Sequence, residues 1–242
     1  MRSDSQSSPA QAKFLRTLSA SMHQMAQPLS TIQLTLELAL LGPTTAEQYH
    51  EMAEGLLQQL RRAVESMQFT AWLALFQQPA ADVQDVPLDA TLENVISDLR
   101  RTLEAAQFQF LFLRSERKQL VRISPTRLRQ MLFYVLQAAQ GCSQAGDLVQ
   151  IEIQEKVGHT ALRIQHAQRE TNRAKEATPQ QDDLVDRALA LAEAIVSSAG
   201  GEFRATVDPL LIVADFPVRV DGAVTKNELS DASTLQIAIG SH

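Results

Sequence analysis

One histidine near the N-terminus stands in surroundings that suit it to chemistry. His23 opens the segment His23-Gln24-Met25-Ala26-Gln27-Pro28-Leu29. A lone helical histidine is most often a solvated surface residue, yet an imidazole can also carry a phosphoryl group, because one ring nitrogen attacks while the other keeps its proton. Gln24 can accept a hydrogen bond from such a ring but is a poor base. We therefore take His23 as the candidate nucleophile.

The remaining residues of reactive type show no comparable pattern. The other histidines lack metal-ligand spacing, so we predict no metal site and expect them at the surface: His50, His159, His166 and His242. Cys142 is the one cysteine, which excludes an intramolecular disulfide and favours a reducing compartment. Nothing near Cys142 suggests an activating base, so we expect an inert thiol.

The apolar pattern around His23 predicts the helix that positions it. Apolar residues recur at alternating spacings of three and four, the seam of a helix that packs in coiled-coil fashion, at Leu15, Leu18, Met22, Met25, Leu29, Ile32 and Leu36. This helix should span residues 12–40. His23 falls beside the seam and should project to solvent. Pro28 cannot donate the helical hydrogen bond to the carbonyl of Gln24, so we expect a kink or a weakened turn there.

A second helix of the same kind follows a turn. Gly42-Pro43 is a stop-and-turn signal, and Thr44 or Thr45 can cap the next helix. The apolar spacing then repeats to about Phe76, through Tyr49, Ala53, Leu56, Leu60, Ala63 and Met67. Residues 12–78 are predicted to form a helical hairpin after a disordered lead-in at 1–11. Such a hairpin cannot bury its seam alone, so we expect a homodimer that closes a four-helix bundle.

The rest of the chain predicts a second domain of α+β type, an α/β sandwich at 86–218. A linker at 79–85 precedes it, and a loose tail at 219–242 follows. Helices are expected at 88–106, 125–140 and 184–198, and strands at 108–113, 120–123, 149–154, 161–166, 202–207 and 210–216. Residues 167–181 are expected to form a mobile loop. This order favours helices on one face of a mostly antiparallel sheet.

Composition narrows the classes of partner. The formal charge is −6, and no cluster of Lys and Arg is interleaved with aromatic residues, which argues against nucleic acid or anionic lipid. No apolar run approaches the roughly 20 residues that span a bilayer, and residues 1–11 are polar. We expect a soluble cytoplasmic protein that binds another protein or a small molecule.

Motif by motif, residues 12–218 resemble the core of a sensor histidine kinase. The segment from His23 to Leu29 is similar to the phosphoacceptor box of that family, which reads His, an acidic residue, two variable residues, a polar residue, Pro and Leu. The stretch 127–132 resembles the start of the first nucleotide-binding helix. The stretch 189–196 with Gly200-Gly201 resembles the helix after the second glycine-rich motif, and Phe216-Pro217-Val218 the closing strand. The resemblance implies catalytic roles for His23, Gln24, Gln27 and Pro28.

The departures from the family pattern concern its ATP site. Tyr134 and Ala138 stand where the family carries two asparagines, the second of which ligates Mg²⁺. Residues 164–172 contain neither the Asp nor the glycines of the adenine-binding segment. Asp186 and Ala188 replace glycines that let backbone amides approach phosphate, and a carboxylate repels triphosphate. We predict that this chain binds no cofactor, and that ATP does not bind in the family's usual way.

These features lead to three hypotheses about function. The first is a dimeric histidine phosphotransferase, in which His23 exchanges a phosphoryl group with receiver-domain aspartates of response regulators and the receiver supplies Mg²⁺. Gln24 favours it, because active kinases usually have an acidic residue after the histidine to assist attack on ATP. The second is a pseudokinase scaffold that binds a response regulator or a kinase without carrying phosphate. The third is an active kinase with a divergent ATP site.

Overall fold

The computed structural model describes residues 9–41, 45–115, 117–144, 146–156, 158–168 and 179–217. The chain divides into two compact units, Met1–Leu75 and Phe76–His242. None of the helices in the described part of the chain combines the length and apolar character that a bilayer-spanning segment needs.

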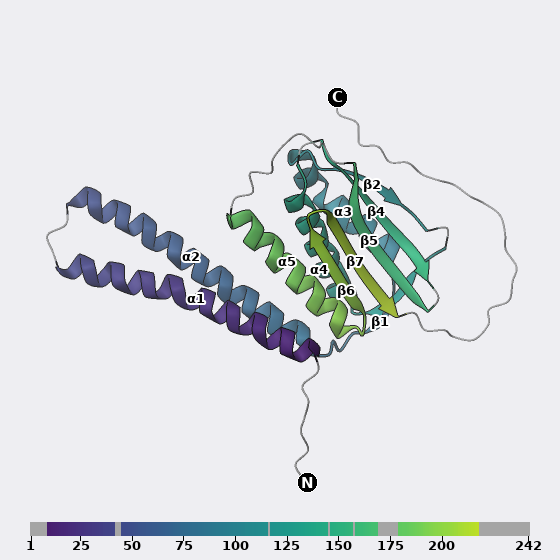
Figure 1. The fold of residues 1–242 in the computed structure, drawn as a ribbon, viewed down its shortest axis with the longest axis horizontal. Helices are drawn as coiled ribbons and strands as arrows, with labels where there is room; N and C mark the ends of the chain where they lie inside the picture. Colours follow the sequence, from purple (N-terminus) through teal and green to yellow (C-terminus); the bar gives the residue numbers. More distant parts are fainter. Residues whose placement is uncertain are drawn as a thin grey trace, which may run out of the picture. The chain divides into compact units, whose positions relative to one another are not determined.

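The first unit is a helical hairpin (Figure 1). Helix α1 spans Pro9–Leu41, and helix α2 spans Ala46–Gln77. Thr45 caps α2 as expected: its hydroxyl accepts from the backbone N–H of Gln48 (3.3 Å), and its own N–H donates to the Gln48 side chain (3.0 Å). The lead-in prediction was wrong for residues 9–11, which are helical because Pro9 can occupy a first helical position; residues 1–8 lie outside the described range.

The apolar seam of α1 is two adjacent stripes rather than the one that was predicted. Leu18, Met25 and Ile32 are half-buried, in line with buried Ser21 and Pro28. The other stripe is between 47% and 55% exposed and recurs every seven residues, at Leu15, Met22, Leu29 and Leu36. On α2 the buried positions include Ala63, Phe69 and Leu73. The first stripe therefore holds the hairpin together, and the second is left uncovered within one chain.

Helix α1 continues on both sides of Pro28. The two turns after His23 nevertheless have altered hydrogen bonding. The hydroxyls of Ser30 and Thr31 donate to the carbonyl oxygens of Ala26 (3.0 Å) and Gln27 (3.1 Å). Such bonds from a hydroxyl to the carbonyl four residues earlier slightly weaken a helix and favour bending. These bonds lie beside the Pro28 position, and the helix itself is unbroken there; the predicted weakening at Pro28 stays a prediction.

The second unit contains a small and a large sheet (Figure 1). Strands β1 (Gln84–Pro87) and β3 (Leu120–Ile123) form an antiparallel pair. The large sheet has the order β2-β4-β5-β7-β6, with only β2 and β4 parallel. Its strands are β2 (Gln109–Leu113), β4 (Leu148–Lys156), β5 (His159–Gln168), β6 (Glu202–Val207) and β7 (Leu210–Pro217). The helices are α3 (Leu88–Ala105), α4 (Pro125–Cys142) and α5 (Pro179–Ser198).

Residues alternate across the large sheet, as strand geometry requires. The face toward the helices is buried and apolar, for example at Ile151, Ile164 and Ile212, which are paired across β4, β5 and β7. The other face carries polar residues, including Gln150 and Gln165. Figure 1 shows α3, α4 and α5 on one side of the strands. The predicted α+β class, with a helical hairpin followed by an α/β sandwich, is confirmed.

Two expectations about connections in the second unit need correction. Strand β1 occupies the end of the expected linker at 79–85, because it pairs with β3 at a distance in sequence. Strand β5 runs to Gln168, and α5 begins at Pro179, so only 169–178 remain of the expected loop at 167–181. Those residues lie outside the described range, as does the predicted tail at 219–242.

The C-terminal end of α5 explains the paired glycines that follow it. Gly200 has a φ of +77° and donates to the carbonyl of Ser197 (3.0 Å), while Gly201 donates to the carbonyl of Val196 (3.0 Å). This is the Schellman arrangement, which ends a helix with a left-handed residue. A Cβ on Gly201 would lie 2.4 Å from the carbonyl oxygen of Asp215. Gly201 therefore allows α5 to end directly against β7.

Candidate functional site

His23 lies on the exposed side of α1, together with Gln24 and Gln27. Because residues four apart on a helix are neighbours, His23 and Gln27 share one face. Pro28 is buried on the other side of α1, so it stands apart from the imidazole. Residues 23–29 thus present three polar side chains at the surface and place the Pro28 ring in the hairpin interior. An exposed imidazole of this kind can be reached by a second protein.

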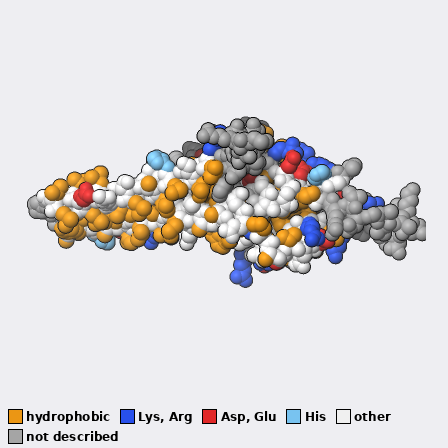
Figure 2. Space-filling model, turned by 90° about the horizontal axis from the view of Figure 1, so that it is seen from below, with side chains coloured by type: hydrophobic (Ala, Val, Ile, Leu, Met, Phe, Trp, Pro, Cys, Tyr) orange, Lys and Arg blue, Asp and Glu red, His pale blue; other side chains and the backbone are white. Residues whose placement is uncertain are grey.

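Three exposed leucines share the face of His23, and sequence analysis missed them. Leu34, Leu38 and Leu41 are 58%, 61% and 83% exposed. They follow His23 by about three, four and five helical turns, so they lie in line with it along α1. They are distinct from the uncovered stripe through Leu29 and Leu36. Figure 2 shows hydrophobic side chains gathered along the hairpin surface. We call these three residues the leucine ridge.

The interior beneath His23 holds another feature that sequence analysis missed. Ser21 Oγ and Thr70 Oγ1 form a hydrogen bond between α1 and α2. Ser21 and Ser66 are buried, with exposures of 2% and 3%. One feature of the sequence could have indicated this bond. Ser21 stands at the spacing of three and four residues that Leu18, Met25 and Pro28 share on the side of α1 toward α2. A polar residue at such a position is unusual in an apolar seam.

Tyr134 and Ala138, the predicted replacements for asparagines, lie on α4. Tyr134 is partly buried, and its ring packs edge-on against Phe76 and Phe133, with centroid distances of 6.5 Å and 5.8 Å. Burial raises the pKa of the Tyr134 hydroxyl. Ala138 has an exposure of 0%. Neither position presents an amide oxygen.

Asp186 and Ala188, the predicted replacements for glycines, lie on α5. Partial burial raises the pKa of Asp186, and the nearby carboxylates of Asp182 and Asp183 raise it further. Ala188 is 4% exposed. Helices α4 and α5 also approach closely: a Cβ on Gly141 of α4 would lie 2.6 Å from Cγ2 of Val185. These residues do not fit a nucleotide triphosphate, since they add negative charge and supply no backbone cradle of glycines.

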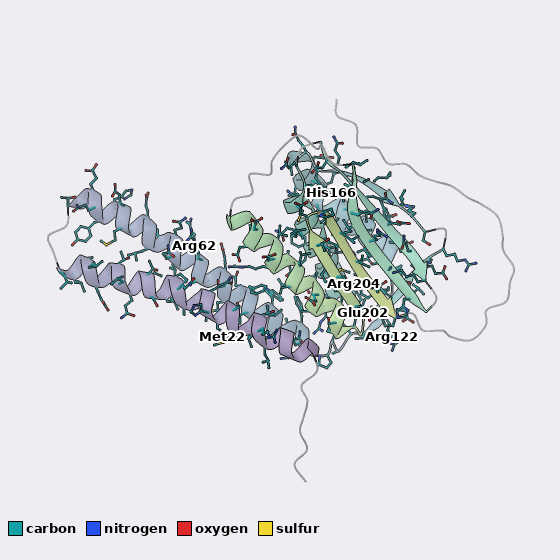
Figure 3. The ribbon with its side chains drawn as sticks, viewed as in Figure 1. Met22, Arg62, Arg122, His166, Glu202 and Arg204 are labelled. Carbon is teal, nitrogen blue, oxygen red and sulfur yellow. The ribbon has the colours of Figure 1, made fainter. Side chains whose placement is uncertain are left out.

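His166 is buried, with 7% of its side chain exposed, so the expected surface placement was wrong (Figure 3). Its Nε2 lies 3.2 Å from Ser143 Oγ and 3.8 Å from Asp147 Oδ2. The Ser143 hydroxyl donates its proton to the carbonyl of Ala139 (2.8 Å), so it accepts from His166, and Nε2 carries the proton. The cluster packs the end of β5 onto the end of α4. Its members are too far apart in sequence for spacing to reveal it.

Among the described residues, the other reactive positions form no further site. His50 and His159 are exposed, as expected, and His50 lies 3.3 Å from Glu54; His242 is outside the described range. Cys142 is buried. The described residues contain no group of three or more His, Cys, Asp or Glu side chains that could hold a metal ion. A cavity of about 370 Å³ is lined in part by Arg122, Ser124 and Arg127, but Arg122 faces Asp85 (3.6 Å) and Ser124 binds Asp82 (2.9 Å).

Comparison with solved structures identifies the fold. No family model and no curated protein matches the chain. The Acinetobacter baumannii histidine kinase AdeS superposes with a TM-score of 0.56 at 18% identity, covering 81% of this chain and 98% of that one. The histidine kinase ThkA, in a complex with the response regulator TrrA, gives a TM-score of 0.55 at 10% identity, covering 84% of this chain and 61% of that one. The chain therefore has the fold of a sensor histidine kinase core, with a helical hairpin followed by an ATPase-like α/β domain.

Proposed function

We propose that this protein is a dimeric histidine phosphotransferase of two-component signalling, in which His23 exchanges a phosphoryl group with receiver-domain aspartates. The observation that carries the proposal is the exposed imidazole of His23 on the hairpin of a kinase-type fold, flanked by Gln24 rather than by an acidic residue. Direct attack on ATP needs more assistance from such a neighbour than attack on an acyl phosphate does.

The transfer step needs little from this chain beyond position. A ring nitrogen of His23 forms a bond to phosphorus while the bond from phosphorus to the aspartyl oxygen breaks, which releases the aspartate as a carboxylate. The second ring nitrogen keeps its proton during the step. The receiver brings the Mg²⁺ that balances charge on the phosphoryl oxygens. The reverse step returns the group to a receiver, so both directions use the same geometry.

The second unit supports a protein donor rather than ATP. Ala138 is fully buried and supplies no ligand atom for Mg²⁺, and Ala188 is buried where a glycine would be needed. The resemblance puts Asp186 where the family has a glycine beside the triphosphate, and a carboxylate at such a position would repel that group. Gly141 and Val185 bring α4 and α5 together without space for a ligand between them at that point. These residues together support a phosphoryl donor other than ATP.

The uncovered stripe on α1 supports a dimer. Leu15, Met22, Leu29 and Leu36 repeat at the heptad interval and are about half exposed in one chain. Burial of such a stripe against a second copy would complete a four-helix bundle. His23 lies on another face of α1, so it would stay accessible in that assembly.

The leucine ridge supports docking of a receiver domain. Leu34, Leu38 and Leu41 lie in line with His23, so a protein that reaches the imidazole approaches this face. A second copy would cover the other stripe instead. Aliphatic residues exposed in a row are typical of protein-protein contact surfaces. The superposed ThkA structure contains a response regulator, which favours a partner of this class.

The proposal is tested with purified receivers that carry phosphate. Incubation should label the unsubstituted chain at His23, detected as phosphohistidine by mass spectrometry, and His23→Ala should take no label. Leu38→Gln should slow labelling by roughly tenfold through weaker docking. Leu36→Gln is the matched control, because it should loosen the dimer and leave docking intact. Absence of label with every plausible receiver, together with a His23→Ala variant that keeps full activity in cells, would favour the scaffold hypothesis instead.

A further inference from the structure

A layer of hydroxyl groups crosses the hairpin interior beside His23. Ser21 of α1 and Ser66 of α2 are 2% and 3% exposed, and Thr70 of α2 is half-buried beside them. The Thr70 hydroxyl donates to the carbonyl oxygen of Ser66 (2.8 Å). Since a hydroxyl has one proton, the bond between Ser21 Oγ and Thr70 Oγ1 is donated by Ser21. The layer is a directed chain from Ser21 through Thr70 to the backbone of α2.

This layer interrupts a seam that is otherwise largely apolar. Leu18 and Met25 flank Ser21 on α1, and Phe69 and Leu73 flank Thr70 on α2. A buried hydroxyl destabilises a protein when it has no partner, whereas an apolar pair of similar volume stabilises a seam at least as well as a hydroxyl pair does. Stability alone does not account for the pair. Its particular contribution must lie in which arrangement of the helices it permits.

The arrangement that the pair selects is the register of α1 against α2. An apolar seam with alternating spacing can slide by a turn or a heptad and again place apolar residues opposite one another. The hydroxyl pair removes this equivalence for a slip that brings Ser21 opposite Ala74, one turn further along α2, because Ser21 would then face an apolar side chain. With Ser21 opposite Thr70, the same spacing places Ile32 opposite Gln59. A polar pair in a seam is a known means of specifying register.

The register of α1 against α2 sets the position of His23 along α2. Ser21 precedes His23 by about half a helical turn, so the two residues move together. A slip of one turn would displace His23 by about 5.4 Å along α2. A misplacement of about 1 Å can lower a reaction rate on the order of 100-fold. C-terminal to His23, α1 has weaker backbone bonding. Pro28 lacks an N–H donor, and the hydroxyls of Ser30 and Thr31 bond to carbonyls four residues earlier. The hydroxyl layer is therefore the firmer constraint on the position of His23.

We propose that the hydrogen bond between Ser21 and Thr70 is a register lock that positions His23 relative to α2. Ser21 and Thr70 are positioning residues, since neither touches the transferred group. The effect of the lock on phosphoryl transfer rests on the proposed function. Its effect on helix register does not, so the two can be measured separately.

Disulfide cross-linking of the full chain in a Cys142→Ala background measures the register. Cysteines in place of Ile32 and Gln59 report the observed register, and cysteines in place of Ile32 and Ala63 report a slip of one turn. Mass spectrometry separates products within a chain from products between chains. With native hydroxyls, oxidation should cross-link the first pair and not the second.

Two variants test the lock. Ser21→Ala with Thr70→Val removes both hydroxyls at nearly constant volume, and Ser21→Thr with Thr70→Ser keeps them. The first should cross-link in the shifted register and accept phosphate at least tenfold more slowly, with little change in the thermal midpoint, while the second should behave like the unsubstituted chain. Exclusive cross-linking in the observed register after removal of both hydroxyls would overturn the lock. A shifted register in a protein whose native form takes no phosphate would uphold the lock and refute the proposed function.

Discussion

Asp215 of β7 shows how one carboxylate ties together the outer face of the large sheet. Its side chain is 9% exposed; Oδ1 accepts from Lys156 Nζ (2.9 Å) and Oδ2 accepts from Arg204 Nη2 (3.1 Å). Burial by itself raises the pKa of Asp215, but the hydrogen bonds from Lys156 and Arg204 outweigh it and hold the pKa below its ordinary value. Figure 3 shows Arg204 beside Glu202 on β6. The ionised form of Asp215 is therefore favoured by folding.

Asp215→Asn should lower the free energy of unfolding by about 1.5 kcal/mol at pH 7, since both partners are partly exposed and screened. A depressed pKa contributes stability above the ordinary carboxyl pKa, near 4, and this contribution is lost as pH falls through the folded-state value. Urea unfolding measures this effect. The free energy of unfolding should differ between the variant and the native protein at pH 7, and the difference should be smaller at pH 3.

Glu202→Gln is the matched control for this prediction. Glu202 also faces Arg204, but at 3.8 Å and with 79% of its side chain exposed. Its replacement should change stability by less than about 0.5 kcal/mol at either pH. An Asp215→Asn deficit of the same size at pH 3 and pH 7 would contradict the charge-based explanation.

At the scale of elements, the stability of the second unit depends on the contact between the end of α5 and β7. A Cβ on Gly201 would lie 2.4 Å from the Asp215 carbonyl oxygen and 2.8 Å from Cγ1 of Val196. Gly201→Ala should therefore force α5 away from β7 and lower the free energy of unfolding by about 2 kcal/mol. Chemical denaturation followed by circular dichroism measures the change.

Gly55 provides the opposite case in the hairpin. It lies within α2, and a Cβ there meets nothing within 4 Å. Gly55→Ala should stabilise the hairpin by about 0.5–1 kcal/mol, because alanine has less conformational freedom to lose on folding. A Gly201→Ala protein at least as stable as the unsubstituted chain would show that the close contact does not limit that position.

At the scale of the whole molecule, the question is whether the second unit still binds a nucleotide. Calorimetric titration of the full chain with ATP and Mg²⁺ should show no binding at micromolar concentrations, whereas an active kinase core measured alongside should show it. Ala138→Asn should not restore binding. The position is fully buried, so the added amide should lower stability by about 1–3 kcal/mol instead. Clear micromolar binding by the unsubstituted chain would favour the hypothesis of a divergent active kinase.

Local patterns predicted much of the fold. The helices of the hairpin, the cap at Thr45 and the strand Leu120–Ile123 follow from helical spacing, a capping side chain and alternation, each of which is contained within a few consecutive residues. The apolar spacing also placed His23 beside the seam, whereas its role as the candidate nucleophile came from the resemblance of residues 23–29 to the phosphoacceptor box. Its role in phosphoryl transfer stays a prediction until phosphohistidine is measured.

Other features of the fold depend on residues that are distant in the sequence. Strand β1 forms because it pairs with β3. His166 is buried because the fold brings Ser143 and Asp147 next to its imidazole. The alternating spacing on α1 did not reveal that its apolar residues split into a stripe toward α2 and an uncovered stripe, nor that Ser21 meets Thr70. Most helices and strands could be predicted from local periodicity, because periodicity is a property of consecutive residues, and β1 is the exception. Burial and pairing of polar groups were decided by tertiary structure, because they depend on which surfaces folding brings together.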